Sequence, residues 1–352
     1  MNADLKGRTV AVTGASGFIG GRLVAALVAE GARVTALVRS RHGAAALQAL
    51  GAQVVVAPLV AGPGLPAALA GQDVLFHFAY DMRASGADNL VAFQALVTAA
   101  QTAGVKRIVH ASSVVVYDDW PDGRLTEASP ISSATGGGYR QAKMAMEAAL
   151  LAQAIPVAIL QPTIVWGAGS AQWTEAAFAA LRRGGVVLPD PVGLCPALHV
   201  GDLVQAALLA AILPDLGQER FLIDGPERIT WAQFYQAHAD SLGQGQVILR
   251  PRAELEARLG PQPTPGRGPQ GPSAAARVSA GLRRLVGNRR FEAAVSAAKA
   301  MKGSTGPSYP DRSQLILWSA RPEVATDRAA ARLGYAPSVT LVAGLAAIAA
   351  QL

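Results

Sequence analysis

The sequence predicts an α/β protein built on a doubly wound parallel sheet, and three observations support this prediction. Short runs of β-branched residues alternate with alanine-rich stretches through about the first 165 residues, which is the pattern of βαβ units. The first such run leads directly into a glycine-rich turn and then into a helical stretch. With 51% hydrophobic and only 16% charged residues in a chain of 352, the protein can bury a large core.

The expected strands and helices follow in order along the chain. We predict strands at Thr9–Thr13, Arg33–Val38, Gln53–Ala57, Asp73–Phe78, Arg107–Ala111 and Pro156–Leu160. We predict helices at about Gly17–Glu30, Asn89–Ala103 and Gly138–Leu151, and Gly31 suits the position that ends the first of them. We expect residues 1–170 to form the domain that contains the sheet, with later segments returning to it, and residues 171–352 to form mainly a smaller α/β domain.

The formal net charge of +7 is concentrated in one segment. Arg250–Lys302 carries 11 lysines and arginines and 3 glutamates, a net charge of +8, which leaves the rest of the chain at −1. Within it, Gly260–Pro272 is rich in proline and glycine and predicts a loop, while Ala274–Met301 predicts amphipathic basic helices. Because Phe291 is its only aromatic residue, we interpret the segment as a solvated basic cap and expect no nucleic-acid partner.

Neither of the two long uncharged stretches predicts a membrane span. Residues 148–174 and 333–352 are both interrupted by proline and glycine, which leaves apolar stretches shorter than the roughly 20 residues that a bilayer requires. Residues 1–8 lack the apolar region of a signal peptide, and the single cysteine, Cys195, cannot form an internal disulfide. We therefore expect a cytoplasmic protein.

The turn after the first strand has the spacing of a dinucleotide-binding loop. Three glycines, Gly14, Gly17 and Gly20, occur in the sequence TGASGFIG at 13–20, where a side chain would block the approach of a pyrophosphate to the backbone. The start of the following helix offers free N–H groups and the positive end of the helix dipole. We therefore expect this loop to bind a dinucleotide.

This loop and five later motifs resemble the extended branch of the short-chain dehydrogenase/reductase superfamily, the NAD(P)-dependent epimerase/dehydratase-like proteins. The later motifs are DVLFHFA at 73–79, SSVVVY at 112–117, YRQAK at 139–143, PTIVWG at 162–167 and HVGDL at 199–203. The resemblance covers about residues 8–245 and resumes at 327–352. It implies a Rossmann-type sheet with a smaller C-terminal substrate domain, and a homodimer that pairs Asn89–Ala103 and Gly138–Leu151 across a two-fold axis.

A catalytic pair lies within the third of these motifs. Tyr139 and Lys143 are four residues apart on a predicted helix, so their side chains share one face and can meet. Because a nearby ammonium stabilises a phenolate, we expect Lys143 to lower the pKa of Tyr139, whose hydroxyl would then give or take a proton. The resemblance implies that Ser113 completes a catalytic triad and that Lys143 also holds the nicotinamide ribose.

The resemblance also implies the remaining site residues. Cofactor contacts are expected from the glycine loop and from later segments, namely Gly14, Ser16, Gly17, Phe18, Ile19, Gly20, Phe78, Ala79, Lys143, Pro162, Thr163 and Ile164. The substrate candidates are Tyr80, Val115, Trp166 and Cys195. We expect His77 to pack in the core, Asp202 to cap a helix, and no metal site, because no cluster of His, Cys, Asp and Glu has metal-ligand spacing.

The end of the second strand predicts which cofactor is preferred. An NAD-specific site carries an acidic residue there that binds the ribose 2′-hydroxyl, but this chain has no Asp or Glu between Glu30 and Asp73. Arg39, Ser40 and Arg41 stand at this position instead and suit a 2′-phosphate. We therefore expect NADP(H) to be preferred, with NAD(H) as the alternative.

Three departures from the family pattern bear on the reaction. Leu188–Leu198 has no basic residue with which to hold a nucleotide-sugar diphosphate, Val114 and Val115 replace the Asp-Glu pair of sugar dehydratases, and Gln161 stands where many members have arginine. We therefore expect an oxidoreductase that transfers hydride between NADP(H) and a carbonyl or secondary alcohol of a small molecule. The alternatives are a nucleotide-sugar epimerase and a non-catalytic NADP-binding regulator.

Overall fold

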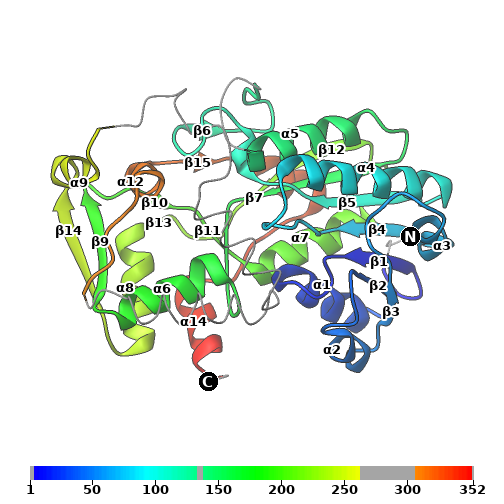
Figure 1. The fold of residues 1–352 in the computed structure, drawn as a ribbon, viewed down its shortest axis with the longest axis horizontal. Helices are drawn as coiled ribbons and strands as arrows, with labels where there is room; N and C mark the ends of the chain where they lie inside the picture. The colour runs from blue at the N-terminus through cyan, green and yellow to red at the C-terminus, as the bar shows by residue number, and fades with distance from the viewer. Residues whose placement is uncertain (1–3, 133–137, 262–305, 351–352) are drawn as a thin grey trace, which may run out of the picture.

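The computed structural model describes residues 4–132, 138–261 and 306–350 (Figure 1). Its centre is a seven-stranded parallel sheet with the strand order β12-β7-β5-β4-β1-β2-β3. The strands are β1 (Thr9–Thr13), β2 (Arg33–Val38), β3 (Gln53–Val56), β4 (Val74–His77), β5 (Arg107–Ala111), β7 (Val157–Pro162) and β12 (Gln218–Ile223). The chain builds to one side of β1 with β2 and β3 and then to the other side with β4 onward. The carboxyl ends of β1 and β4 therefore form the topological switch point, where ligands bind in such sheets.

Helices cover both faces of this sheet (Figure 1). The helices α1 (Phe18–Ala29) and α7 (Val200–Ile212) pack on one face, and α3 (Gly64–Leu69), α4 (Gly86–Thr102) and α5 (Gly138–Leu151) pack on the other. Because the strands are buried on both sides, β1 alternates between the two cores: Val10 and Val12 belong to one and Ala11 to the other. The predicted fold class is confirmed.

The six predicted strands are present with their ends shifted by no more than two residues, and the seventh, β12, was not predicted. The three predicted helices are also present, and Gly31 follows α1 with a φ of +77°, as expected for a residue that ends a helix. Of the helices beside the sheet, α7 and the two short helices α2 (Ala44–Ala49) and α3 were not predicted. The expectation for Asp202 was wrong: His199 Nδ1 caps α7 by accepting the N–H of Gly201, while Asp202 accepts the N–H groups of Ser338 and Val339.

The second part of the structure is a smaller α/β lobe beside the carboxyl ends of the strands (Figure 1). It contains the parallel pair β9 (Gly185–Asp190) and β14 (Gln246–Pro251), together with α6 (Ala176–Arg182), α8 (Trp231–Leu242), α9 (Arg252–Leu259), α12 (Arg312–Ser319) and α14 (Leu341–Ala349). Its core is aromatic and includes Trp166, Trp231, Phe234 and Trp318. The described residues also form three short strand pairs: β6 (Arg124–Leu125) with β15 (Glu323–Val324), β8 (Ile164–Trp166) with β11 (Ala197–His199), and β10 (Leu194–Cys195) with β13 (Ile229–Thr230). The remaining elements are the short 3₁₀ helix η1 (Val114–Val116), the π-helix η2 (Ala171–Glu175) and the helix α13 (Asp327–Leu333).

Part of the predicted basic segment lies outside the described residues. Residues 250–261 end β14 and form α9, whereas 262–302, including the predicted basic helices, are not described. Among the described residues, no helix combines the length and the apolar character that a membrane crossing needs.

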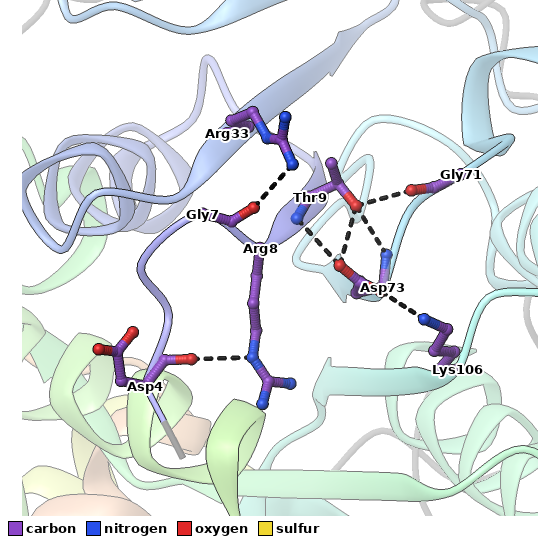
Figure 2. Close-up of polar contacts among 8 residues, drawn as sticks. All are labelled: Asp4, Gly7, Arg8, Thr9, Arg33, Gly71, Asp73 and Lys106. Atoms are coloured by element: carbon purple, nitrogen blue, oxygen red, sulfur yellow. Dashed lines mark hydrogen bonds and ion pairs between the residues drawn. The ribbon is translucent and has the colours of Figure 1, made fainter. Parts of the chain in front are cut away.

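The amino ends of β1, β4 and β5 are tied together by polar contacts (Figure 2). Thr9 donates its N–H to Asp73 Oδ2 at 3.1 Å and its hydroxyl to Gly71 O at 2.6 Å. Lys106 Nζ lies 2.8 Å from Asp73 Oδ1, and this hydrogen bond lowers the pKa of Asp73 to about 2. These contacts fix the three strands in register, so that the loops following them meet at the opposite edge of the sheet.

Candidate active site

The glycine loop packs tightly against the loop that follows β4. A Cβ on Gly14, whose φ is +70°, would lie 2.7 Å from the carbonyl carbon of Phe78 and 2.8 Å from the nitrogen of Ala79. A Cβ on Gly20 would collide with the carbonyl oxygen of Gly14. Two of the three predicted glycines are therefore required by the close approach of the chain to itself, in addition to any ligand.

The first turn of α1 is available to an anion. Its N-cap residue is Gly17, which has no side chain to accept the free N–H groups, and the first turn contains no acidic residue. The helix therefore begins with donors and a positive dipole end that face the glycine loop. This arrangement suits a phosphate group.

A cleft of about 510 Å³ opens at the carboxyl ends of β1, β2 and β4. Seven of the predicted site residues line it: Gly14, Ser16, Gly17, Arg39, Phe78, Ala79 and Tyr80. The apolar part of its lining comes chiefly from residues that were not predicted, namely Leu37, Ala57, Pro58, Leu59, Val60 and Phe93. This volume is typical of small-molecule sites, and an apolar wall beside β3 suits a flat heterocycle.

Arg39 forms an ion pair across the rim of this cleft. Its Nη1 lies 2.5 Å from Oδ2 of Asp81, a cleft residue that was not predicted. The Arg83 N–H and the Arg39 guanidinium together hold the pKa of the Asp81 carboxyl below its usual value. Ser40 and Arg41, the other residues predicted to bind a 2′-phosphate, are exposed next to Arg39.

Tyr139 and Lys143 lie on the same face of α5, and both contact Tyr80. The rings of Tyr80 and Tyr139 meet edge to face with their centroids 4.9 Å apart. Lys143 Nζ lies 5.0 Å from the Tyr80 ring centroid and 5.9 Å from that of Tyr139, and it donates to Ala111 O at 2.7 Å. Tyr80, predicted only as a substrate contact, therefore links the predicted catalytic pair to the cleft.

Burial has the largest effect on the pKa values of Tyr139 and Lys143. Burial raises the pKa of Tyr139 to about 12, and a hydrogen bond with Ser113 opposes this shift. Burial lowers the pKa of Lys143 to about 8, and the charge of Glu147 opposes it. The lowered pKa that we expected for Tyr139 is therefore not found: burial raises it instead, and the phenol is protonated at neutral pH.

Ser113 lies where β5 ends and η1 begins. Its hydroxyl accepts the N–H of Val115 at 3.4 Å and hydrogen-bonds Tyr139. Val115, a substrate candidate, is half-buried, and its carbonyl accepts a hydrogen bond of 2.9 Å from Arg140 Nε. The structure thus brings the hydroxyls of Ser113 and Tyr139 together, next to the Lys143 side chain.

The remaining predicted residues are divided between the sheet edge and the second lobe. Pro162 ends β7 and Ile164 begins β8, while the Thr163 hydroxyl donates to Asp224 at 2.7 Å. Phe18 and Ile19 begin α1 and are half-buried. Trp166 is 1% exposed and packs in the aromatic core against His199 and Phe234, and the buried Cys195 lines a separate pocket of about 180 Å³.

Three polar residues, two of them fully buried, were missed from the sequence. Glu147 is fully buried one turn after Lys143, and His110 is fully buried and stacks on His77 at 5.1 Å. Asp224, whose pKa burial raises to about 6, lies beside Thr163. Glu147 could have been found from its four-residue spacing after Lys143, but no sequence signal marks the other two. Among the described residues, no group of His, Cys, Asp and Glu could hold a metal ion.

Comparison with known proteins identifies the family. A family model described as NAD(P)H-binding matches residues 14–170. The 4-hydroxy-2-methyl-3-oxo-4-farnesyl-3,4-dihydroquinoline-1-oxide ketoreductase of Stigmatella aurantiaca is 34% identical over 225 residues, which are 61% of this chain and 67% of that protein. Sterol demethylase protein B of Methylococcus capsulatus is 30% identical over 270 residues, or 71% of this chain and 78% of that protein.

Solved structures agree on the fold. UDP-N-acetylglucosamine 4-epimerase from Bacillus cereus has a TM-score of 0.68 at 14% identity and covers 98% of this chain and 96% of its own. At this identity the likeness concerns the fold alone. The sheet topology and the glycine loop of this chain agree with the relatives found by sequence. The chain belongs to the extended branch of the short-chain dehydrogenase/reductase superfamily, among the NAD(P)-dependent epimerase/dehydratase-like proteins.

Proposed function

We propose that the protein is an NADP(H)-dependent reductase that converts a carbonyl of a small molecule to a secondary alcohol. The observation that supports it most is the convergence of Ser113 and Tyr139 beside Lys143, connected through Tyr80 to the dinucleotide cleft. A nicotinamide cofactor, when bound, supplies the hydride. The chain's own residues then need to hold the carbonyl and deliver one proton to its oxygen.

Tyr139 supplies that proton from its hydroxyl. A phenol with a pKa raised to about 12 is protonated at neutral pH, which suits the direction of reduction. Ser113, already hydrogen-bonded to Tyr139, orients the carbonyl oxygen between the two hydroxyls. Lys143 places a positive charge under the Tyr80 and Tyr139 rings and stabilises negative charge as the proton leaves.

The cleft supports binding of a phosphorylated dinucleotide. The uncapped first turn of α1 suits the pyrophosphate, and the apolar wall from Ala57 to Val60 suits the adenine ring. Arg39 in the cleft wall, with no acidic residue on its strand, supports NADP(H) over NAD(H).

The proposed substrate is a large apolar carbonyl compound. The relatives' names support this class, because one denotes a ketoreductase of a farnesyl-bearing dihydroquinoline oxide and the other a protein of sterol demethylation. Leu188–Leu198 carries no basic residue that could bind the diphosphate group of a nucleotide sugar, and this argues against such a substrate. We therefore favour reduction of a carbonyl over epimerisation of a nucleotide sugar as the activity.

Consumption of NADPH tests the proposal. The purified protein is mixed with NADPH and a panel of polycyclic and long-chain ketones, and with nucleotide sugars in parallel. We expect one NADPH to be oxidised for each alcohol formed from a ketone, and we expect Tyr139→Phe to abolish this turnover while cofactor affinity stays nearly unchanged. Interconversion of nucleotide sugars without net NADPH loss would overturn the proposal in favour of an epimerase. NADPH binding without turnover, unaffected by Tyr139→Phe, would indicate a non-catalytic regulator.

A further inference from the structure

We propose that Asp81 is a specificity-determining residue that competes with the cofactor's 2′-phosphate for Arg39. In this view the ion pair between the two side chains spans the cofactor cleft, and a 2′-phosphate takes over Arg39 as it binds. The inference rests on the proposed preference for NADP(H), which it deepens by naming the residue that limits it.

The two residues come from opposite sides of the glycine loop. Arg39 follows β2 and Asp81 follows β4, and β1 lies between these strands. Two strand spacings of about 4.8 Å therefore separate the two loops. The Arg39 side chain has to cross the carboxyl end of β1 to bring its Nη1 to 2.5 Å from Asp81 Oδ2, so it lies over the mouth of the cleft that both residues line.

The loop that carries Asp81 is held in place, whereas Arg39 is free to leave. Asp81 donates its N–H to Asn89 Oδ1 at 2.8 Å, and its carbonyl accepts from Asn89 Nδ2 at 2.9 Å. Its Oδ1 accepts the Arg83 N–H at 2.9 Å, and Asn89 itself is buried. The Arg39 side chain, by contrast, is 75% exposed. An exchange of partners is therefore a movement of Arg39, while the negative charge of Asp81 remains at the rim.

The negative charge of Asp81 affects the binding of NADP(H) and NAD(H) differently. Binding of NADP(H) brings a doubly charged phosphate toward Arg39, which must break the Asp81 pair, and it places that phosphate near a carboxylate of the same sign. NAD(H) has a neutral hydroxyl at this position, so neither cost arises. Removal of the Asp81 charge should therefore strengthen NADPH binding and leave NADH binding nearly unchanged.

The variant Asp81→Asn tests this on the full-length protein. Asparagine keeps an oxygen for the Arg83 N–H and removes only the charge. Asp88→Asn is the matched control, because Asp88 lines the same cleft but pairs with Ser85 instead of Arg39. Calorimetric titrations measure the affinity for NADPH and NADH, and also for 2′,5′-ADP and ADP, which isolate the adenosine half.

We expect Asp81→Asn to tighten NADPH and 2′,5′-ADP by about two- to fivefold, the range of an exposed ion pair, with NADH and ADP nearly unchanged. We expect Asp88→Asn to leave unchanged both the ratio of NADPH to NADH affinity and the ratio of 2′,5′-ADP to ADP affinity. Arg39→Ala should weaken NADPH by about tenfold to a hundredfold, and in that background Asp81→Asn should have no selective effect.

Three results would overturn the role of Asp81. They are an unchanged ratio of NADPH to NADH affinity in Asp81→Asn, a weakening of NADH that marks Asp81 as a ribose ligand, and a selective effect that persists without Arg39. The reductase proposal is judged separately by ketone-dependent NADPH oxidation and would survive each of these results. A wild-type protein that binds NADH more tightly would refute the proposed cofactor preference, while the same variants still judge Asp81.

Discussion

Glu147 forms an ion pair of 2.7 Å with Arg220 Nε and thereby joins α5 to the edge strand β12 inside the protein. The Glu147 carboxyl is fully buried and also accepts bonds from Gln161 Nε2 at 3.0 and 3.1 Å and from the Ser112 hydroxyl. Tyr117 completes the network by donating its hydroxyl to Gln161 at 2.6 Å. One carboxylate therefore joins the helix of Tyr139 and Lys143 to the carboxyl ends of β5 and β7 and to the middle of β12.

This network explains the departure at Gln161. Many family members have arginine at that position, and a buried carboxylate without a cation would be costly. Here Arg220 from the neighbouring strand supplies the positive charge, while Gln161 supplies hydrogen bonds to both carboxyl oxygens. Ser112, which this carboxylate contacts, directly precedes Ser113, so the network lies next to Ser113 and next to the helix that carries Tyr139 and Lys143.

The first prediction concerns the pH dependence of turnover in Glu147→Gln. Burial holds the pKa of Lys143 at about 8, so its ammonium is lost as the pH rises through that value. The charge of Glu147 opposes this shift, and its removal should lower the pKa of Lys143 further. We expect the basic limb of kcat/KM to move to lower pH, measured between about pH 6 and pH 10.

A purely structural role for Glu147 would give another result. Removing one partner of a buried pair typically costs about 3–5 kcal/mol, and glutamine should cost less because it keeps the shape and one acceptor. Urea unfolding measures this loss. If Glu147→Gln lowers stability but leaves the basic limb in place, Glu147 has no influence on Lys143.

The second prediction separates the roles of Lys143 and Ser113. Lys143→Met removes the charge beside Tyr139 and the predicted ribose contact together, so both turnover and cofactor affinity should fall. Ser113→Ala should lower kcat by about 10²- to 10⁴-fold, the range for a lost orienting or proton-transfer group, with cofactor affinity nearly unchanged. Steady-state kinetics and cofactor titration of both variants provide the check. Equal losses of cofactor affinity in the two variants would contradict the assigned roles.

The sheet could be predicted from the sequence because its strands are buried on both faces and read as short β-branched runs. The strand that was missed, β12, is the exception: its first half, from Gln218 to Arg220, is polar because the strand lies at the edge. Its assignment requires knowing that Arg220 pairs with the buried Glu147, which is a tertiary contact. Local propensity could not supply that information.

The site was predictable where its chemistry depends on local spacing and not where it depends on packing. Tyr139 and Lys143 were found because four residues make one helical turn. Arg39 was found as a cation, but its partner Asp81 comes from a loop two strands away. The pKa of Tyr139 was predicted in the wrong direction because burial, which raises it to about 12, leaves no mark in the sequence.

The third prediction concerns stability in acid. Burial lowers the pKa of His77 to about 3 and that of its stacked neighbour His110 well below 6.5. The folded protein thus holds both rings neutral while the unfolded chain protonates them below about pH 6.5. The stability that is present above this pH should decline steadily as the pH falls toward 3.

His110→Phe should reduce this acid sensitivity. Phenylalanine fills the same space beside His77 and Phe93 and cannot be protonated. Urea unfolding at about pH 7 and pH 5 measures the difference in free energy between the two conditions, which should be smaller in the variant than in the wild type. An equal loss in both proteins would show that His110 does not contribute to the acid sensitivity.

The fourth prediction is that the protein is a homodimer that pairs through α4 and α5, which pack against each other on one face of the sheet. The outer surface of α4 exposes Val91, whose exposed fraction is 65%. Val91→Arg should place a charge in the expected interface and give a monomer, while light scattering at about micromolar concentration should give a dimer mass for the wild type. Val342→Arg is the control, because Val342 is 71% exposed on α14 in the other lobe and should leave the mass unchanged. A monomeric wild type would refute the dimer itself. If the dimer persists in Val91→Arg but is lost in Val342→Arg, the interface lies in the second lobe instead.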